Sequence, residues 1–238
     1  MDRANRHYLS VLVALFICQW ALLAIAPVDR QAWALENLLV VIAVALLALT
    51  HRSFPLSRIS YTAIFIFLSI HTVGAHYTYA KVPYDQWLQD WFNFSLNREL
   101  AFERNHFDRF VHFLYGLLIA YPIREMFIRI AGVKGFWGYF LPLDLTMSSS
   151  MIFELFEWLA AELFGGDLAM DFLGIQGDIW DAHKDMALAS LGALIAMVFT
   201  ASLNRTLQRD FAEEWNESLR IKNQLPLGED LIKQYLSR

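Results

Sequence analysis

The sequence contains a single cysteine, Cys18, which lies within an apolar run. One cysteine excludes an intrachain disulfide and the thiolate-rich ligand sets of structural zinc and iron–sulfur sites. Charge is also scarce, because Asp, Glu, Lys and Arg make up 18% of the 238 residues, against about 25% in soluble domains. The formal net charge of −5 provides no basic surface, so we expect no nucleic-acid partner.

Hydrophobic residues make up 57% of the chain and fall in long runs. A run of about 20 apolar residues crosses a bilayer core of about 30 Å as a helix. Backbone groups must pair internally in lipid, so helices are the reasonable form for these runs. The predicted fold is therefore all-α, a polytopic membrane helical bundle of about six transmembrane helices. The predicted spans are 8–26, 32–50, 59–75, 107–128, 138–164 and 186–204.

The first run follows Arg3 and Arg6, as the core of a signal peptide does, and 24–26 resembles a cleavage site. The run is longer than a typical signal core, and Pro27 would follow the cut. We therefore interpret it as an uncleaved first span.

Lys and Arg are distributed unequally between the two sides of the predicted bundle. Segment 165–183, which would lie outside, has neither residue. Because basic residues collect in cytoplasmic connections, this bias predicts that both termini are cytoplasmic, N-in and C-in. The basic residues of the predicted inner connections are Arg3, Arg6, Arg52, Arg58, Arg124, Arg129, Lys134, Arg205 and Arg209.

The predicted domains are a six-helix transmembrane domain, 1–204, and a cytoplasmic amphipathic tail, 205–238. Segment 81–105 is too polar to span, and Trp87 and Trp91 lie four residues apart on an aromatic stripe within it. Such rings favour the headgroup level, so we expect a short interfacial helix at the outer surface. An aromatic lid packed on the bundle is the alternative.

Several ionisable residues fall at one depth near the outer surface when the helical rise is applied to these spans. A charge at that depth costs about 2–3 kcal/mol, so each should face a partner, a cavity or an ion. Spacing places Asp108 with His112, Glu154 with Glu157, and Asp181 with Asp185 on shared helix faces. We therefore expect one common site.

Imidazole and carboxylate groups in one pocket are typical ligands of Zn²⁺, Mn²⁺ or Fe²⁺, so we expect one divalent metal ion. The predicted ligands are His76, His112 and Asp185, with Asp181 or Asp108 as alternatives. The candidate catalytic carboxylates are Glu154, Glu157 and Asp108, with one of the two glutamates as general base.

The predicted reaction is metal-dependent hydrolysis or group transfer on a lipid or lipid-linked substrate. Arg109 would hold a phosphate or carboxylate through its fork of donors. Trp87 and Trp91 would admit the substrate from the outer leaflet.

Other interpretations of the same residues stay open. The histidines could simply hydrogen-bond neighbouring helices, and Asp178 or Asp181 could be helix N-caps. A proton-coupled transporter could extend its path through Asp144. Haem could bind between His112 and either His71 or His76. A structural membrane protein would need no site at all.

Five sequence blocks resemble the YjdF-like family of bacterial inner-membrane proteins, and together they cover most of the chain. The family more usually has Thr and Gln where this chain has Ile175 and His183. The resemblance implies a multi-pass protein of the bacterial inner membrane and implies no established activity. The blocks are His76-Tyr77-Thr78-Tyr79 with Val82-Pro83, Asn105-His106-Phe107-Asp108-Arg109 with His112-Phe113 and Gly116, Arg124-Glu125, Glu154 with Glu157-Trp158, and residues 174–181 with Asp185-Met186.

Overall fold

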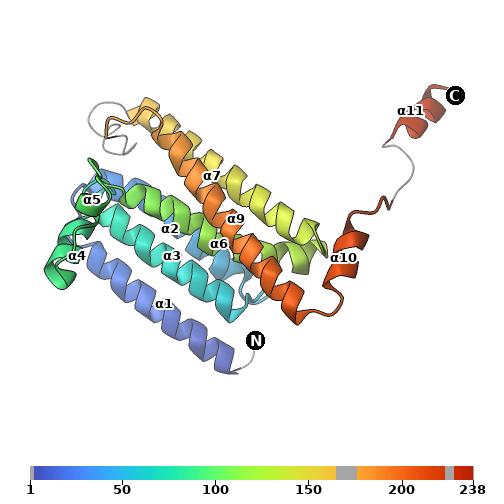
Figure 1. The fold of residues 1–238 in the computed structure, drawn as a ribbon, viewed down its shortest axis with the longest axis horizontal. Coiled ribbons are helices and arrows are strands. Elements are labelled where there is room, and N and C mark those ends of the chain that lie inside the picture. The colour runs from blue at the N-terminus through green and yellow to red at the C-terminus, as the bar shows by residue number, and fades with distance from the viewer. Residues whose placement is uncertain (1–2, 165–175, 223–227, 238) are drawn as a thin grey trace.

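The computed structural model describes residues 3–164, 176–222 and 228–237, and every regular element within these ranges is a helix (Figure 1). The prediction of an all-α chain is confirmed. In chain order, the helices are α1 (Arg3–Leu23), α2 (Arg30–Thr50), α3 (Arg58–Tyr77), α4 (Tyr84–Phe92), α5 (Leu96–Glu99), α6 (Phe107–Ala131), α7 (Trp137–Phe164), α9 (Asp181–Leu207), α10 (Phe211–Ser218) and α11 (Glu229–Leu236).

The long helices α1, α2, α3, α6, α7 and α9 each have 20 residues or more and correspond to the predicted spans. Among the described residues, five of them, all except α7, are long and apolar enough to cross a membrane. α7 has 28 residues but carries Asp144, Glu154, Glu157 and Glu162, which reduce its apolar character. The chain is thus a polytopic helical bundle.

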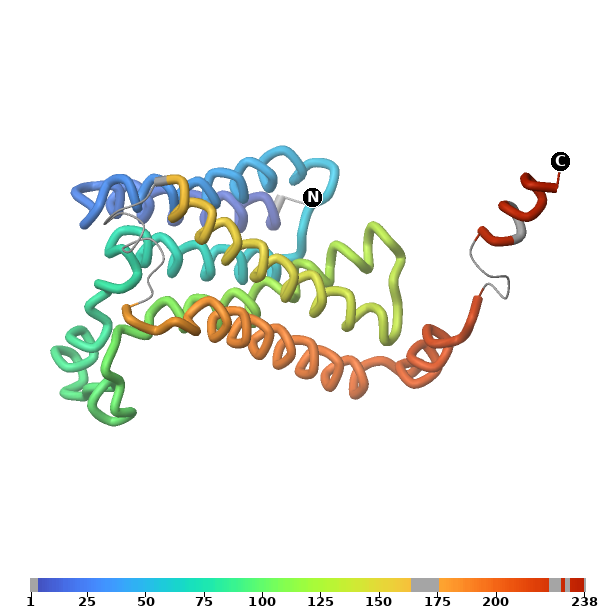
Figure 2. The backbone as a smooth tube through the Cα atoms, turned by 90° about the horizontal axis from the view of Figure 1, so that it is seen from above, coloured from blue at the N-terminus to red at the C-terminus, as the bar shows by residue number. Residues whose placement is uncertain are grey.

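α6 lies at the centre of the bundle. It packs most extensively against α9 and also contacts α3 and α7, whereas α1 and α2 each pack on α3 (Figure 2). The α4 end, meaning the end of the bundle that carries α4 and α5, lies to the left in Figure 1. α6 and α9 both begin at this end, so the two helices run parallel. Their first turns therefore share one depth, as the sequence predicts.

Glycines set the close approach of α6 and α9. A Cβ atom added at Gly116 would lie 1.9 Å from the Ala189 carbonyl oxygen, and one at Gly192 would lie 2.2 Å from the Phe113 carbonyl oxygen. Small residues let two helix backbones approach in lipid, where packing replaces the hydrophobic effect as the driving force. This crossing fixes the first turns of both helices relative to one another.

At the opposite end of the bundle, polar contacts join the start of α3 to α6. Glu125 accepts hydrogen bonds from the Ser57 backbone N–H at 2.9 Å and from the Ser60 hydroxyl at 2.6 Å. Arg129 bonds both Glu125 and the Pro55 carbonyl oxygen, each at 2.6 Å. These hydrogen bonds pair free backbone groups at the start of α3. Glu125 and Arg129 therefore have a structural role at this end of the bundle.

The polar segments outside the long helices also form helices. α4 is the short helix expected within 81–105, and its position relative to a membrane surface stays a prediction. α10 packs on the bundle, because Phe211 and Trp215 contact Tyr139 and the Phe136 backbone N–H bonds Ser218 Oγ at 3.0 Å. The sequence also predicts a break near Pro226 in the amphipathic tail, and this position lies outside the described residues.

Candidate functional site

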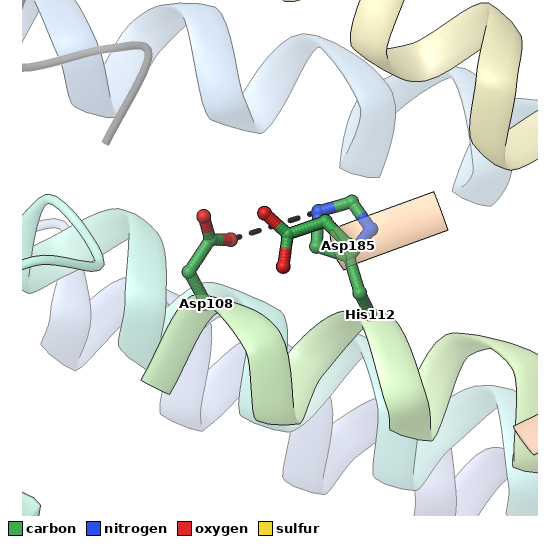
Figure 3. A group of neighbouring side chains, drawn as sticks. All are labelled: Asp108, His112 and Asp185. Atoms are coloured by element: carbon green, nitrogen blue, oxygen red, sulfur yellow. Dashed lines mark ion pairs between the residues drawn. The ribbon is translucent and has the colours of Figure 1, made fainter. Parts of the chain in front are cut away.

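Asp108 and His112 of α6 and Asp185 of α9 form a cluster that we call the Asp–His–Asp group. One ligand atom from each lies within 4.8 Å of the other two, and Figure 3 shows the three side chains facing one another. His112 Nε2 lies 3.7 Å from Asp108 Oδ1. Two ligands at about 2 Å from one ion lie at most about 4 Å apart. A shift of about 1 Å would therefore let these side chains share an ion.

Two glutamates of α7 border the Asp–His–Asp group. Glu154 Oε1 lies 3.4 Å from His112 Nε2, and Glu157 follows three residues later on α7. His112, Glu157 and Asp185 are buried, so few water molecules screen these charges. Among the described residues, Asp185 Oδ1 and Glu154 Oε1 have no hydrogen-bond partner. Buried acceptors without donors are costly and indicate an added proton or cation.

A cavity of about 310 Å³ extends from this group into the bundle. Its polar end combines Asp108, His112 and Glu157 with His71 and Tyr79. Apart from Tyr115, Ser149 and Ser150, the remainder is apolar and lies between α2, α3, α6 and α7. The residues of this apolar part include Leu39, Val40, Ile42, Ala43, Leu46, Phe67, Leu68, Val111 and Phe153.

The cavity opens sideways between α2 and α7. Both helices line it, yet α2 packs on α3 and makes no extended contact with α7. The α2 side chains Leu39, Ile42 and Leu46 line the cavity while remaining 41%, 46% and 58% exposed. In a membrane, surfaces of this kind face lipid. An amphiphile could therefore reach the polar end laterally.

Two arginines pair with Asp181, which does not belong to the Asp–His–Asp group. Arg104 donates to both carboxylate oxygens of Asp181, at 2.7 and 2.8 Å, and Arg109 donates to it at 3.0 Å. Arg109 also bonds Asp178 at 2.5 Å, as does Lys184. Asp181 therefore serves as an ion-pair partner in this structure, and Arg109 is occupied by two aspartates.

Asp178 lies outside the long helices and has a strongly perturbed carboxyl group. Hydrogen bonds from Lys184, the Trp180 backbone N–H and Arg109, with the Lys184 charge, lower the pKa of Asp178 far below its ordinary value. The carboxylate is thus held charged by its donors. Through its bond with Arg109, Asp178 connects the segment just before α9 to the first turn of α6.

Three other predicted residues lie apart from the cavity. His76 Nδ1 bonds the Leu23 carbonyl oxygen at 2.8 Å, and His76 does not belong to the metal-ligand group found among the described residues. Trp87 packs edge-on against Tyr77, and Trp91 is 73% exposed. Neither tryptophan lines the cavity. The structure therefore places both tryptophans away from the cavity that they were predicted to serve.

Sequence reasoning missed the roles of Glu36, His71 and Tyr79. His71 Nε2 bonds the Glu36 carbonyl oxygen at 3.1 Å, and His71 Nδ1 pairs with the Tyr79 hydroxyl. Both ring nitrogens of His71 are thus engaged, which leaves neither for haem. The sequence did carry one signal of these roles, because Glu36 and His71 are ionisable residues that interrupt apolar runs. Residues Gly174 and Ile175 of the last sequence block lie outside the described residues.

Comparison with known proteins places this fold and site in a family context. A family model described as "Predicted membrane protein (DUF2238)" matches residues 8–206. The chain is 41% identical over 183 residues to "Inner membrane protein YjdF" of Escherichia coli (strain K12), covering 76% of this chain and 83% of that protein. No solved structure matches.

Proposed function

This chain belongs to the DUF2238 family of predicted membrane proteins, and we propose that it is a membrane-embedded, metal-dependent hydrolase or transferase acting on a lipid or lipid-linked substrate. Its relative is an inner membrane protein, and we place this chain in the bacterial inner membrane as well, as a multi-pass protein. The observation that carries the proposal is the Asp–His–Asp group at the polar end of a cavity open to lipid.

Asp108, His112 and Asp185 would hold the ion. They offer one nitrogen and carboxylate oxygens, a donor set suited to Zn²⁺, Mn²⁺ or Fe²⁺. A bound cation would polarise the scissile group and activate a water molecule. Glu154, at 3.4 Å from His112, or Glu157, three residues later on α7, would accept the proton from the attacking group.

Charge balance supports a cation at this position. The carboxylates of Asp108, Glu154, Glu157 and Asp185 share one layer and are at most 14% exposed. The two arginines near the start of α6, Arg104 and Arg109, both already pair with Asp178 and Asp181. Buried like charges repel unless a proton or a cation neutralises them. A divalent ion between α6 and α9 would supply that charge.

The proposal of a lipid substrate is based on the shape and lining of the cavity. An apolar compartment that ends at carboxylates and a histidine matches an amphiphile, with its chain among Leu39, Ile42 and Phe67 and its polar group at His112. The lateral opening lets such a molecule arrive from the bilayer without crossing water.

A proton-coupled transporter is the second candidate, because the same carboxylates could be neutralised by protons instead of metal. Asp144, the residue that would extend the path inward, is exposed on α7 and does not line the cavity. The transporter therefore has less structural support than the enzyme.

Elemental analysis of detergent-purified protein, prepared without chelator, tests the proposal. We expect about one metal ion per chain in the wild type and strong loss in His112→Ala and Asp185→Ala, because water cannot replace a ligand at full affinity. His51→Ala and His183→Ala are matched controls outside the group and should retain metal. Folded wild-type protein with far less than one ion per chain would favour the transporter.

A further inference from the structure

Tyr79 occupies an unusual turn after α3. Thr78 and Tyr79 both have left-handed backbone, with φ of 56° and 49°. Two successive residues of this kind are uncommon outside glycine and cost free energy, so surrounding contacts must maintain them. The turn directs the Tyr79 ring back along α3 towards His71, which lies two turns earlier in the chain.

Gly74 provides the space for this ring. A Cβ atom at Gly74 would lie 2.7 Å from two carbon atoms of the Tyr79 ring, so no other residue would fit without displacing it. The ring is buried between α3 and Phe107 of α6. Backbone conformation, glycine and burial thus agree in placing one hydroxyl group beside His71 at the cavity wall.

The hydrogen bonds determine which atoms carry protons. The Glu36 carbonyl oxygen can only accept, so His71 Nε2 carries the hydrogen in their 3.1 Å bond. In the neutral ring His71 Nδ1 is then an acceptor, and the Tyr79 hydroxyl donates to it. The one Tyr79 proton is therefore committed, and its oxygen offers lone pairs to whatever occupies the cavity.

We infer that Tyr79, positioned by His71, binds the hydroxyl group of a lipid in this cavity. A ligand that meets a lone pair must bring a donor, and hydroxyl is the neutral donor common in lipids. This inference rests on the proposed function for the lipid class, and it adds the polar group and the residue that recognises it.

Photolabelling in lipid nanodiscs tests this inference with two probes, a diazirine-bearing decanol and its methyl ether. The ether keeps the chain and the oxygen but cannot donate a hydrogen bond. In wild type, both should label α2 and α3 at the cavity, and decanol should half-saturate at about 3- to 10-fold lower concentration, the effect of one hydrogen bond. Tyr79→Phe should make the two probes equal.

Tyr115→Phe is the matched control, because Tyr115 lines the same cavity and its hydroxyl pairs with Ser149 at 2.6 Å. It should retain the preference for decanol. A purely structural role for Tyr79 would weaken both probes equally and would overturn the inference, as would equal binding of the probes in wild type. Metal content, measured on the same wild-type samples, separates the two claims. Equal binding of the two probes to metal-containing wild type overturns the hydroxyl site alone, and a preference for decanol in metal-free wild type overturns the metal proposal alone.

Discussion

Gly116 of α6 lies directly against the backbone of Ala189 in α9, so closely that a Cβ atom at Gly116 would come within 1.9 Å of the Ala189 carbonyl oxygen. His112 lies one helical turn before Gly116, and Asp185 lies one turn before Ala189. Because the two helices run parallel from the α4 end, the contact sets the distance across the Asp–His–Asp group. The close packing of α6 against α9 therefore also determines the geometry of the candidate metal site.

Gly116→Ala should destabilise the protein by about 1–3 kcal/mol, since overpacking against backbone cannot be relieved by a rotamer change. Metal content should fall with it as α6 and α9 separate. Gly138→Ala in α7 is the control, because the nearest atom to its added Cβ is 3.7 Å away. Thermal unfolding of both variants in detergent measures the difference, and equal stability of the two would contradict a tight crossing.

The Asp178 network should stabilise the protein in a pH-dependent way. Its lowered pKa in the folded state means that the carboxylate contributes stability above its unfolded pKa of about 3.9, and this stability is lost as pH falls through the folded value. We expect Asp178→Asn to lower the Tm by a constant amount above about pH 5 and by less below about pH 4. Asp90→Asn, at an exposed position on α4, is the control and should leave the Tm unchanged. An unchanged Tm for Asp178→Asn at pH 7 would show that the Asp178 network contributes no stability.

The orientation of the bundle predicts the result of reporter fusions. Fusions after Arg52, Lys134 and Arg209 should report the cytoplasm, and a fusion at Trp91 should report the outside, because basic residues collect in the inner connections. A cytoplasmic signal at Trp91 would place the Asp–His–Asp group in the inner leaflet instead.

The spans and the shared depth could be predicted because both follow from simple distances. Hydrophobic run length gave the long helices, and helical rise placed Asp108, His112 and Asp185 at one level before any contact was known. The first span was predicted to end late, because the turn at Ala26, with φ of 47°, has no strong signal in an apolar sequence.

The partners within that level could not be predicted in the same way. Depth alone does not give the rotation of a helix about its axis, so His76 was grouped with residues that it does not join. Asp181 was counted as a ligand because spacing does not reveal that Arg104 and Arg109 reach it from another loop. Tyr79 depends on a left-handed turn and a glycine gap, neither of which has a periodic pattern.

Visible absorption of Co²⁺ added to metal-depleted protein tests the central proposal most directly, because it reports nitrogen and oxygen coordination and not merely metal content. We predict ligand-field bands that saturate at about one equivalent in the wild type. The bands should disappear in His112→Ala and Asp185→Ala and should persist in His183→Ala. Absence of the bands in folded wild type, or unchanged bands in both ligand variants, would contradict a metal site between α6 and α9.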